Sequence, residues 1–99
     1  MTQPLLALYV TPFCGYCRYV MSAIEQLGLE VEIRNIAADR QALEDLFNAR
    51  GRTTVPVLRI ISQEDERWMP ESRDIVDYLQ EVKAGVYPGI SAQQPIPGL

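Results

Sequence analysis

The chain has 99 residues, 47% of them hydrophobic, so it can form one domain with a modest core and is not expected to be disordered. A formal net charge of −4 argues against nucleic acid or an anionic membrane as a partner, and no segment has the roughly 20 apolar residues that span a bilayer. Because no signal peptide is visible and there are only two cysteines, we expect a monomer in the reducing cytoplasm.

The first part of the chain predicts two strands with a helix between them. Leu5–Val10 is almost continuously apolar, as in a central strand that is covered on both faces. A helix is expected over Cys14–Leu27, with Gly28 after it in the left-handed conformation that often ends helices. Apolar and polar residues alternate over Leu29–Ile36, which indicates a half-buried strand.

The second part predicts a helix, a hairpin and a final helix. Asp39 is a suitable N-cap for a helix over Arg40–Ala49. Val55–Ile61 and Arg67–Met69 are expected to pair as antiparallel strands, because only a short polar segment joins them. The last helix is expected over Ser72–Val82.

This order of elements, β-α-β-α-β-β-α, predicts an α/β fold with a four-stranded mixed sheet flanked by three helices. The β-α-β start requires a parallel, right-handed crossover, whereas the short last link requires an antiparallel pair. We therefore expect one domain over residues 1–85 and a tail over residues 86–99, whose prolines and glycines prevent a regular helix or strand.

Both cysteines lie in Cys14-Gly15-Tyr16-Cys17, after the first strand and at the start of the first helix. Unpaired backbone N–H groups at a helix N-terminus favour an anion, so this position favours a thiolate at Cys14, and Arg18 adds a nearby positive charge. Cys17 is placed to resolve a mixed disulfide formed on Cys14. The pair is a candidate redox site at the carboxyl end of a parallel strand, where open α/β sheets bind ligands.

Two other roles for the cysteine pair are open. A structural zinc site normally needs four protein ligands, and the chain has no His and no third Cys, so zinc is disfavoured. Two inert core cysteines are a stronger alternative, although the Gly and Pro residues near Cys14 place it in a loop.

Pro56 is a second candidate feature, because it lacks the N–H that a strand needs for its ladder. A cis bond between Val55 and Pro56 would leave the backbone N–H and C=O of Val55 free to pair with an extended peptide. The alternative, that Pro56 only terminates an edge strand, is equally compatible with the sequence.

Together these residues resemble the glutaredoxin family within the thioredoxin-like fold. The resemblance spans residues 5–82 and rests on three segments, which are Cys14–Cys17, Gly51–Pro56 and Glu71–Ile75. It implies a glutathione-dependent thiol–disulfide oxidoreductase that reduces glutathionylated proteins or small disulfides. It also implies that Cys14 is the nucleophile and Cys17 the resolving thiol.

The same resemblance implies how glutathione is bound. Val55 would pair with the tripeptide backbone beside a cis Pro56, and Glu71-Ser72 resembles the pair that holds the γ-glutamyl group in glutathione transferase N-terminal domains, although Ser72 also suits a plain N-cap. An arginine, Arg52 or Arg40, would replace the lysine that glutaredoxins often carry before the first cysteine. The implied binding residues are Tyr16, Arg52, Thr54, Val55, Pro56, Glu71 and Ser72.

Departures from the family pattern keep other functions open. Gly15 stands where most glutaredoxins have proline. Some members of the family hold a [2Fe–2S] cluster between two chains, and in this chain the ligands would be Cys14 and glutathione thiolates. A thioredoxin-type reductase without glutathione specificity also fits. So does a transferase-like binding domain without redox function, although such a domain is normally followed by a helical domain that 99 residues cannot contain.

Overall fold

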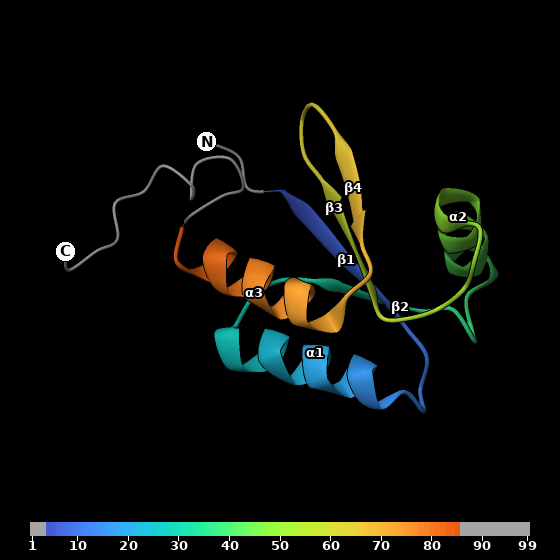
Figure 1. The fold of residues 1–99 in the computed structure, drawn as a ribbon, viewed down its shortest axis with the longest axis horizontal. Helices are drawn as coiled ribbons and strands as arrows, with labels where there is room; N and C mark the ends of the chain where they lie inside the picture. The colour runs from blue at the N-terminus through green and yellow to red at the C-terminus, as the bar shows by residue number, and fades with distance from the viewer. Residues whose placement is uncertain (1–3, 86–99) are drawn as a thin grey trace.

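In the computed structural model, which describes residues 4–85, the sheet has the strand order β2-β1-β3-β4 (Figure 1). The strands are β1 (Leu5–Val10), β2 (Glu32–Asn35), β3 (Val57–Ile61) and β4 (Glu66–Met69). β1 runs parallel to β2 and antiparallel to β3, and β3 runs antiparallel to β4. The predicted mixed four-stranded sheet and the predicted order of elements are therefore confirmed.

Within residues 4–85, three helices cover the sheet, namely α1 (Gly15–Leu27), α2 (Arg40–Arg50) and α3 (Ser72–Lys83). α1 and α3 pack side by side on one face, whereas α2 stands on the other (Figure 1). None of the helices within residues 4–85 has the length and apolar character that crossing a membrane requires. The predicted tail over residues 86–99 lies outside the described residues.

The core has two parts because successive residues of β1 point to opposite faces of the sheet. Leu8 is completely buried under α1 and α3, together with Leu58 and Ile75. Tyr9 is completely buried on the other face, where it packs with Leu46 of α2. The prediction that this strand is covered on both faces is confirmed.

β2 differs from the prediction in length and in burial. It covers Glu32–Asn35 rather than residues 29–36, and Ile33 is 42% exposed. The side chain of Arg34 is only 16% exposed, because it lies against Tyr9 and donates a hydrogen bond to the Tyr9 hydroxyl at 3.1 Å. On this edge strand the polar residue is more buried than its apolar neighbour.

The helix ends follow the predicted chemistry. Gly28 closes α1 with φ 68°, a left-handed conformation that favours glycine. The Asp39 carboxylate caps α2 by accepting from the N–H groups of Gln41 at 3.0 Å and Ala42 at 3.2 Å. Gly28 therefore marks the end of α1, and Asp39 marks the start of α2.

Candidate functional site

Cys14 is the N-cap of α1. Its backbone is extended, with φ −116°, and its sulfur accepts a hydrogen bond from the N–H of Cys17 at 3.2 Å. The sulfur therefore takes the place of the hydroxyl or carboxylate oxygen that usually caps a helix. The predicted position of Cys14 at the helix start is confirmed, and the side chain is half-buried rather than sealed in the core.

Cys17 has a different environment. It is completely buried in the cluster under α1 and α3. Burial, reinforced by the hydrogen bond with Cys14, raises the pKa of the Cys17 thiol to about 12. Cys17 therefore remains a neutral thiol at physiological pH, and Cys14 is the cysteine that a substrate can reach.

The loop before β3 meets the Cys14 loop. The thiol of Cys14 donates to the backbone carbonyl of Val55 at 3.8 Å, and the bond between Val55 and Pro56 is cis, as the family resemblance implies. β3 begins at Val57 rather than Val55 and lies between β1 and β4. The alternative that Pro56 ends an edge strand is therefore wrong.

The N-terminus of α3 is free of side-chain capping. Glu71 is the N-cap but makes no side-chain cap hydrogen bond, and Ser72 is the first helical residue. The plain N-cap alternative for Ser72 is therefore wrong. The first N–H groups of α3 lack a capping side chain, and such groups bind anions well.

An open surface pocket connects the starts of α1 and α3. It is lined by Gly15, Tyr16, Tyr19, Ser72 and Arg73. Tyr16 is 70% exposed, as expected for a ring at the edge of a binding groove. Tyr19 and Arg73 were not predicted, although Tyr19 follows Tyr16 by three positions, a spacing that places both rings on one helix face.

Other candidate residues lie apart from this pocket. Arg52 and Thr54 are exposed in the segment between α2 and β3, and Arg40 is exposed in the first turn of α2. None of these three side chains forms a hydrogen bond or ion pair within residues 4–85. Within the Gly51–Pro56 segment, Val55 contacts Cys14, whereas Arg52 does not.

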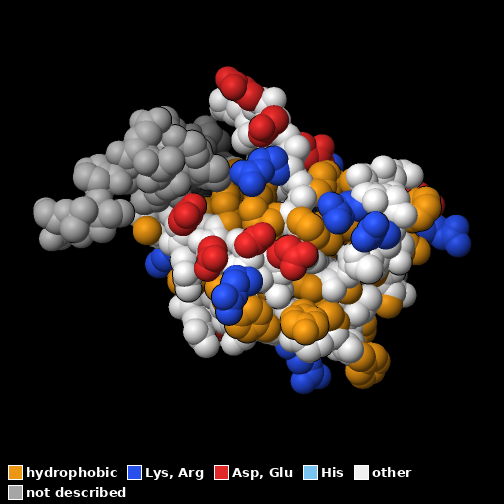
Figure 2. Space-filling view, viewed as in Figure 1, with side chains coloured by type: hydrophobic (Ala, Val, Ile, Leu, Met, Phe, Trp, Pro, Cys, Tyr) orange, Lys and Arg blue, Asp and Glu red, His pale blue; other side chains and the backbone are white. Residues whose placement is uncertain are grey.

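Exposed hydrophobic side chains surround the site. Phe13, in the loop before Cys14, is 95% exposed. Figure 2 shows hydrophobic side chains interspersed with charged ones on the face where α1 lies. A ligand with apolar groups would find contacts beside the Cys14 sulfur.

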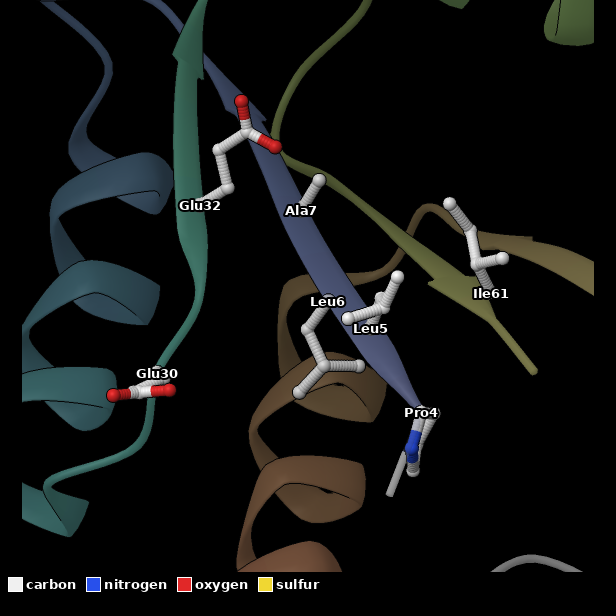
Figure 3. A pocket seen from close by; sticks show the side chains of 7 residues that line it. All are labelled: Pro4, Leu5, Leu6, Ala7, Glu30, Glu32 and Ile61. Carbon is white, nitrogen blue, oxygen red and sulfur yellow. The ribbon is translucent and has the colours of Figure 1, made fainter. Parts of the chain in front are cut away.

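A second pocket lies where β1 begins, at the end of the sheet opposite Cys14 (Figure 3). Pro4, Leu5 and Ile61 supply apolar surface, and Glu30 and Glu32 supply two carboxylates. These charges would repel an anionic ligand. None of the predicted site residues lines this pocket, and among the described residues no three His, Cys, Asp or Glu side chains cluster in a way that could hold a metal ion.

Residues 8–86 match the sequence family described as "Glutathione S-transferase, N-terminal domain". The match includes both cysteines and the Val55, Glu71 and Ser72 positions. No curated protein sequence matches the chain significantly.

Several solved structures are similar. A trimeric glutathione transferase from Leishmania is 26% identical with a TM-score of 0.65, over 82% of this chain and 18% of that protein. A maleylacetoacetate isomerase from Anaeromyxobacter dehalogenans, solved with GSH in its active site, is 22% identical with a TM-score of 0.64, over 88% of this chain and 41% of that one. The present chain thus spans less than half of either protein.

Reduced glutaredoxin C1 from Populus tremula x tremuloides is also similar. It is 20% identical with a TM-score of 0.60, over 87% of this chain and 71% of that one. The predicted thioredoxin-like fold is therefore confirmed, as a fold shared with both glutaredoxins and transferase N-terminal domains.

Proposed function

The chain belongs to the family of glutathione S-transferase N-terminal domains, and we propose that it acts as a glutathione-dependent thiol–disulfide oxidoreductase. The observation that carries the proposal is the position of the Cys14 sulfur, at the start of α1 and 3.8 Å from the Val55 carbonyl. Transfer to an electrophile would not need the second cysteine of this motif, whereas disulfide exchange can use both. We propose glutathionylated proteins and small disulfides as substrates, and the cytoplasm as the place of action.

In the first step, the Cys14 thiolate attacks the glutathionyl sulfur of a mixed disulfide. The bond between Cys14 Sγ and that sulfur forms, the original S–S bond breaks, and the substrate leaves as a thiolate that takes a proton from water. In the second step, the thiolate of a second glutathione attacks the same glutathionyl sulfur. Oxidised glutathione leaves and the Cys14 thiolate is restored, so glutathione is the reductant and the protein is unchanged.

The protein contributes by holding glutathione in line with the sulfur. The N–H of Cys17 donates to Cys14 Sγ and so stabilises negative charge on it. When Cys14 is ionised, its S–H no longer occupies the Val55 carbonyl, which then becomes available to the backbone of the tripeptide. Such alignment accelerates exchange by proximity, without a general base.

The pocket between α1 and α3 provides the rest of the proposed binding site. The N-terminus of α3 would bind the γ-glutamyl carboxylate, and the exposed Glu71 carboxylate would meet the α-amino group. Tyr16 would flank the tripeptide from the α1 side. We propose Arg52 and Thr54 as residues that approach glutathione from the loop before β3.

Cys17 takes part only after Cys14 has reacted. Its thiol is buried and its pKa is raised to about 12, so it is a poor first nucleophile. It offers an intramolecular route for protein disulfides. A [2Fe–2S] cluster is not part of the proposal, because it would need a second chain and two glutathione thiolates in addition to Cys14.

The test is turnover of a glutathionylated peptide with glutathione, coupled to glutathione reductase. We expect Cys14→Ser to reduce turnover to background and Cys17→Ser to retain at least about half of it, since the glutathione route needs one thiolate. Equal loss in both variants would contradict the glutathione mechanism. Equal rates with thioredoxin reductase in place of glutathione and its reductase would favour the thioredoxin-type alternative.

A further inference from the structure

A shallow apolar hollow lies between the outer face of α1 and the edge of the sheet. It is lined by Arg18, Met21, Ser22, Ile24, Glu25 and Ile33. Met21 is 37% exposed and Ile33 is 42% exposed, although each lies beside the buried Ile24. Two apolar side chains are thus left partly in water next to an outer strand, where the sheet order allows another strand to add.

The backbone of β2 is oriented for such an addition. The N–H of Ile36 donates to the carbonyl of Val10 on β1 at 3.0 Å, and Ile33 is the Cα partner of Leu8 in the parallel ladder. Backbone groups of successive residues alternate in direction along a strand, so those of Glu32 and Arg34 face β1 in the same way as Ile36. The N–H and C=O of Ile33 consequently point away from the sheet.

The charges on β2 are complementary to those on a second β2 strand that runs antiparallel to it. In an antiparallel pair of two β2 strands centred on Ile33, Glu32 of each copy lies opposite Arg34 of the other. The side chain of Glu32 is 69% exposed and lies 4.0 Å from the guanidinium of Arg34 in its own chain, so the second copy would share this ion pair across the edge. Opposite charges that face each other across strands favour the pair, whereas a shift of register would separate them.

The charges on the outer face of α1 are likewise complementary to those on an antiparallel copy of the helix. Arg18 and Glu25 are seven positions apart, which places them on one helix face, and both are exposed. Neither forms an ion pair or side-chain hydrogen bond within the described residues. If two α1 helices lie antiparallel with their centres at Met21 and Ser22, each Arg18 faces the Glu25 of the other copy.

The midpoint of the strand pair and the midpoint of the helix pair lie in the same hollow, because Met21, Ser22 and Ile33 all line it. A two-fold axis perpendicular to the sheet at Ile33 therefore satisfies the strand pattern and the helix pattern together. It also brings the exposed Met21 and Ile33 of the two copies together, which removes apolar surface from water.

From this coincidence we propose that the occupant of the hollow is a second copy of this chain. The two β2 strands pair antiparallel about Ile33 and join the two sheets, and the two α1 helices pack above the junction. The proposal does not rest on the proposed function, and it differs from the monomer expected from the sequence. Because it needs no glutathione and no iron, it is also distinct from a cluster-bridged dimer.

The test is sedimentation equilibrium of the full-length reduced chain, without glutathione or metal, over a range of concentrations. We expect a reversible monomer–dimer equilibrium. Arg18→Glu and Glu25→Arg should each weaken dimerisation about tenfold, because each change places like charges together at two symmetry-related contacts. The double variant with both changes should return to within about twofold of the original dissociation constant, since the pairs are restored with reversed sign.

Two further variants locate the interface. Ile33→Pro removes an N–H that points away from β1, so it should abolish dimerisation while circular dichroism and the urea midpoint show a folded monomer. Arg67→Glu on β4, at the opposite edge of the sheet, should leave the dissociation constant unchanged. A chain that stays monomeric at every concentration would overturn the proposal. So would a dimer that is insensitive to the Arg18, Glu25 and Ile33 changes.

Discussion

The sulfur of Cys14 lies 3.8 Å from the carbonyl oxygen of Val55, although the two residues are 41 positions apart in the chain. The sheet explains this proximity, because β1 and β3 pair antiparallel with Tyr9 opposite Val57. The loop that leaves β1 and the loop that enters β3 therefore lie at the same end of the sheet.

The first prediction concerns the pH dependence of stability. Burial raises the pKa of Cys17 from 9.0 to about 12, so between these values the unfolded chain loses this proton while the folded chain keeps it. The stability that Cys17 contributes is complete below pH 9 and falls as the pH rises toward 12. Urea unfolding from pH 7 to 11 should show a steeper alkaline loss for the native sequence than for Cys17→Ala. Parallel curves for the two proteins would contradict the buried-thiol assignment.

The second prediction separates binding from folding at the start of α3. Ser72→Asp places a carboxylate where the N–H groups of the helix lack a capping side chain, which favours the helix but repels an anionic ligand. The KM for glutathione should rise at least about tenfold, as expected for loss of a charge-assisted contact, while the thermal midpoint does not fall. Gln63→Glu adds the same charge in the turn between β3 and β4 and should leave KM unchanged. If both variants raise KM equally, overall charge and not this helix end governs binding.

The third prediction is a stabilising change in the loop that carries Cys14. Gly15 is the first residue of α1, a Cβ added there would meet no atom within 4 Å beyond its chain neighbours and the adjacent helix backbone, and Cys14 before it is extended with ψ 117°. Proline fits the first position of a helix and requires an extended residue before it. Gly15→Pro should therefore raise the free energy of unfolding by about 0.4–1 kcal/mol, through a smaller entropy of the unfolded chain. Urea denaturation measures this change, and a lower midpoint would show that the glycine N–H has a partner in the folded protein.

The fourth prediction concerns the polar cluster beneath α2. The hydroxyl of the completely buried Tyr9 accepts from Arg34 at 3.1 Å and from Arg59 at 3.2 Å, and Asp45 of α2 lies within 3.8 Å of both guanidinium groups. Tyr9→Phe removes the shared acceptor and should lower the free energy of unfolding by about 1–3 kcal/mol. Tyr19→Phe removes a hydroxyl from an exposed ring and should have little effect. Similar losses in the two variants would mean that the cluster does not anchor α2.

Tyr9 and Arg34 also show where sequence patterns stop being informative. The apolar run over Leu5–Val10 correctly predicts a strand covered on both faces, but it does not show that a tyrosine there accepts hydrogen bonds from two arginines. Alternation predicted Arg34 as a solvent-facing residue, yet it is more buried than Ile33. Its burial depends on Asp39 and Asp45 of another element, and a local pattern contains no information about such partners.

The local features of the fold could be predicted from the amino-acid sequence. The order of strands and helices, the helix caps at Asp39 and Gly28 and the placement of Cys14 at the start of α1 all depend on a few neighbouring residues. Which distant residues meet could be seen only in the folded chain. It joined Val55 to Cys14, left Arg52 apart, and opened a pocket between α1 and α3 that includes Tyr19 and Arg73. These relationships come from strand pairing and helix packing, which act between segments that no local pattern connects.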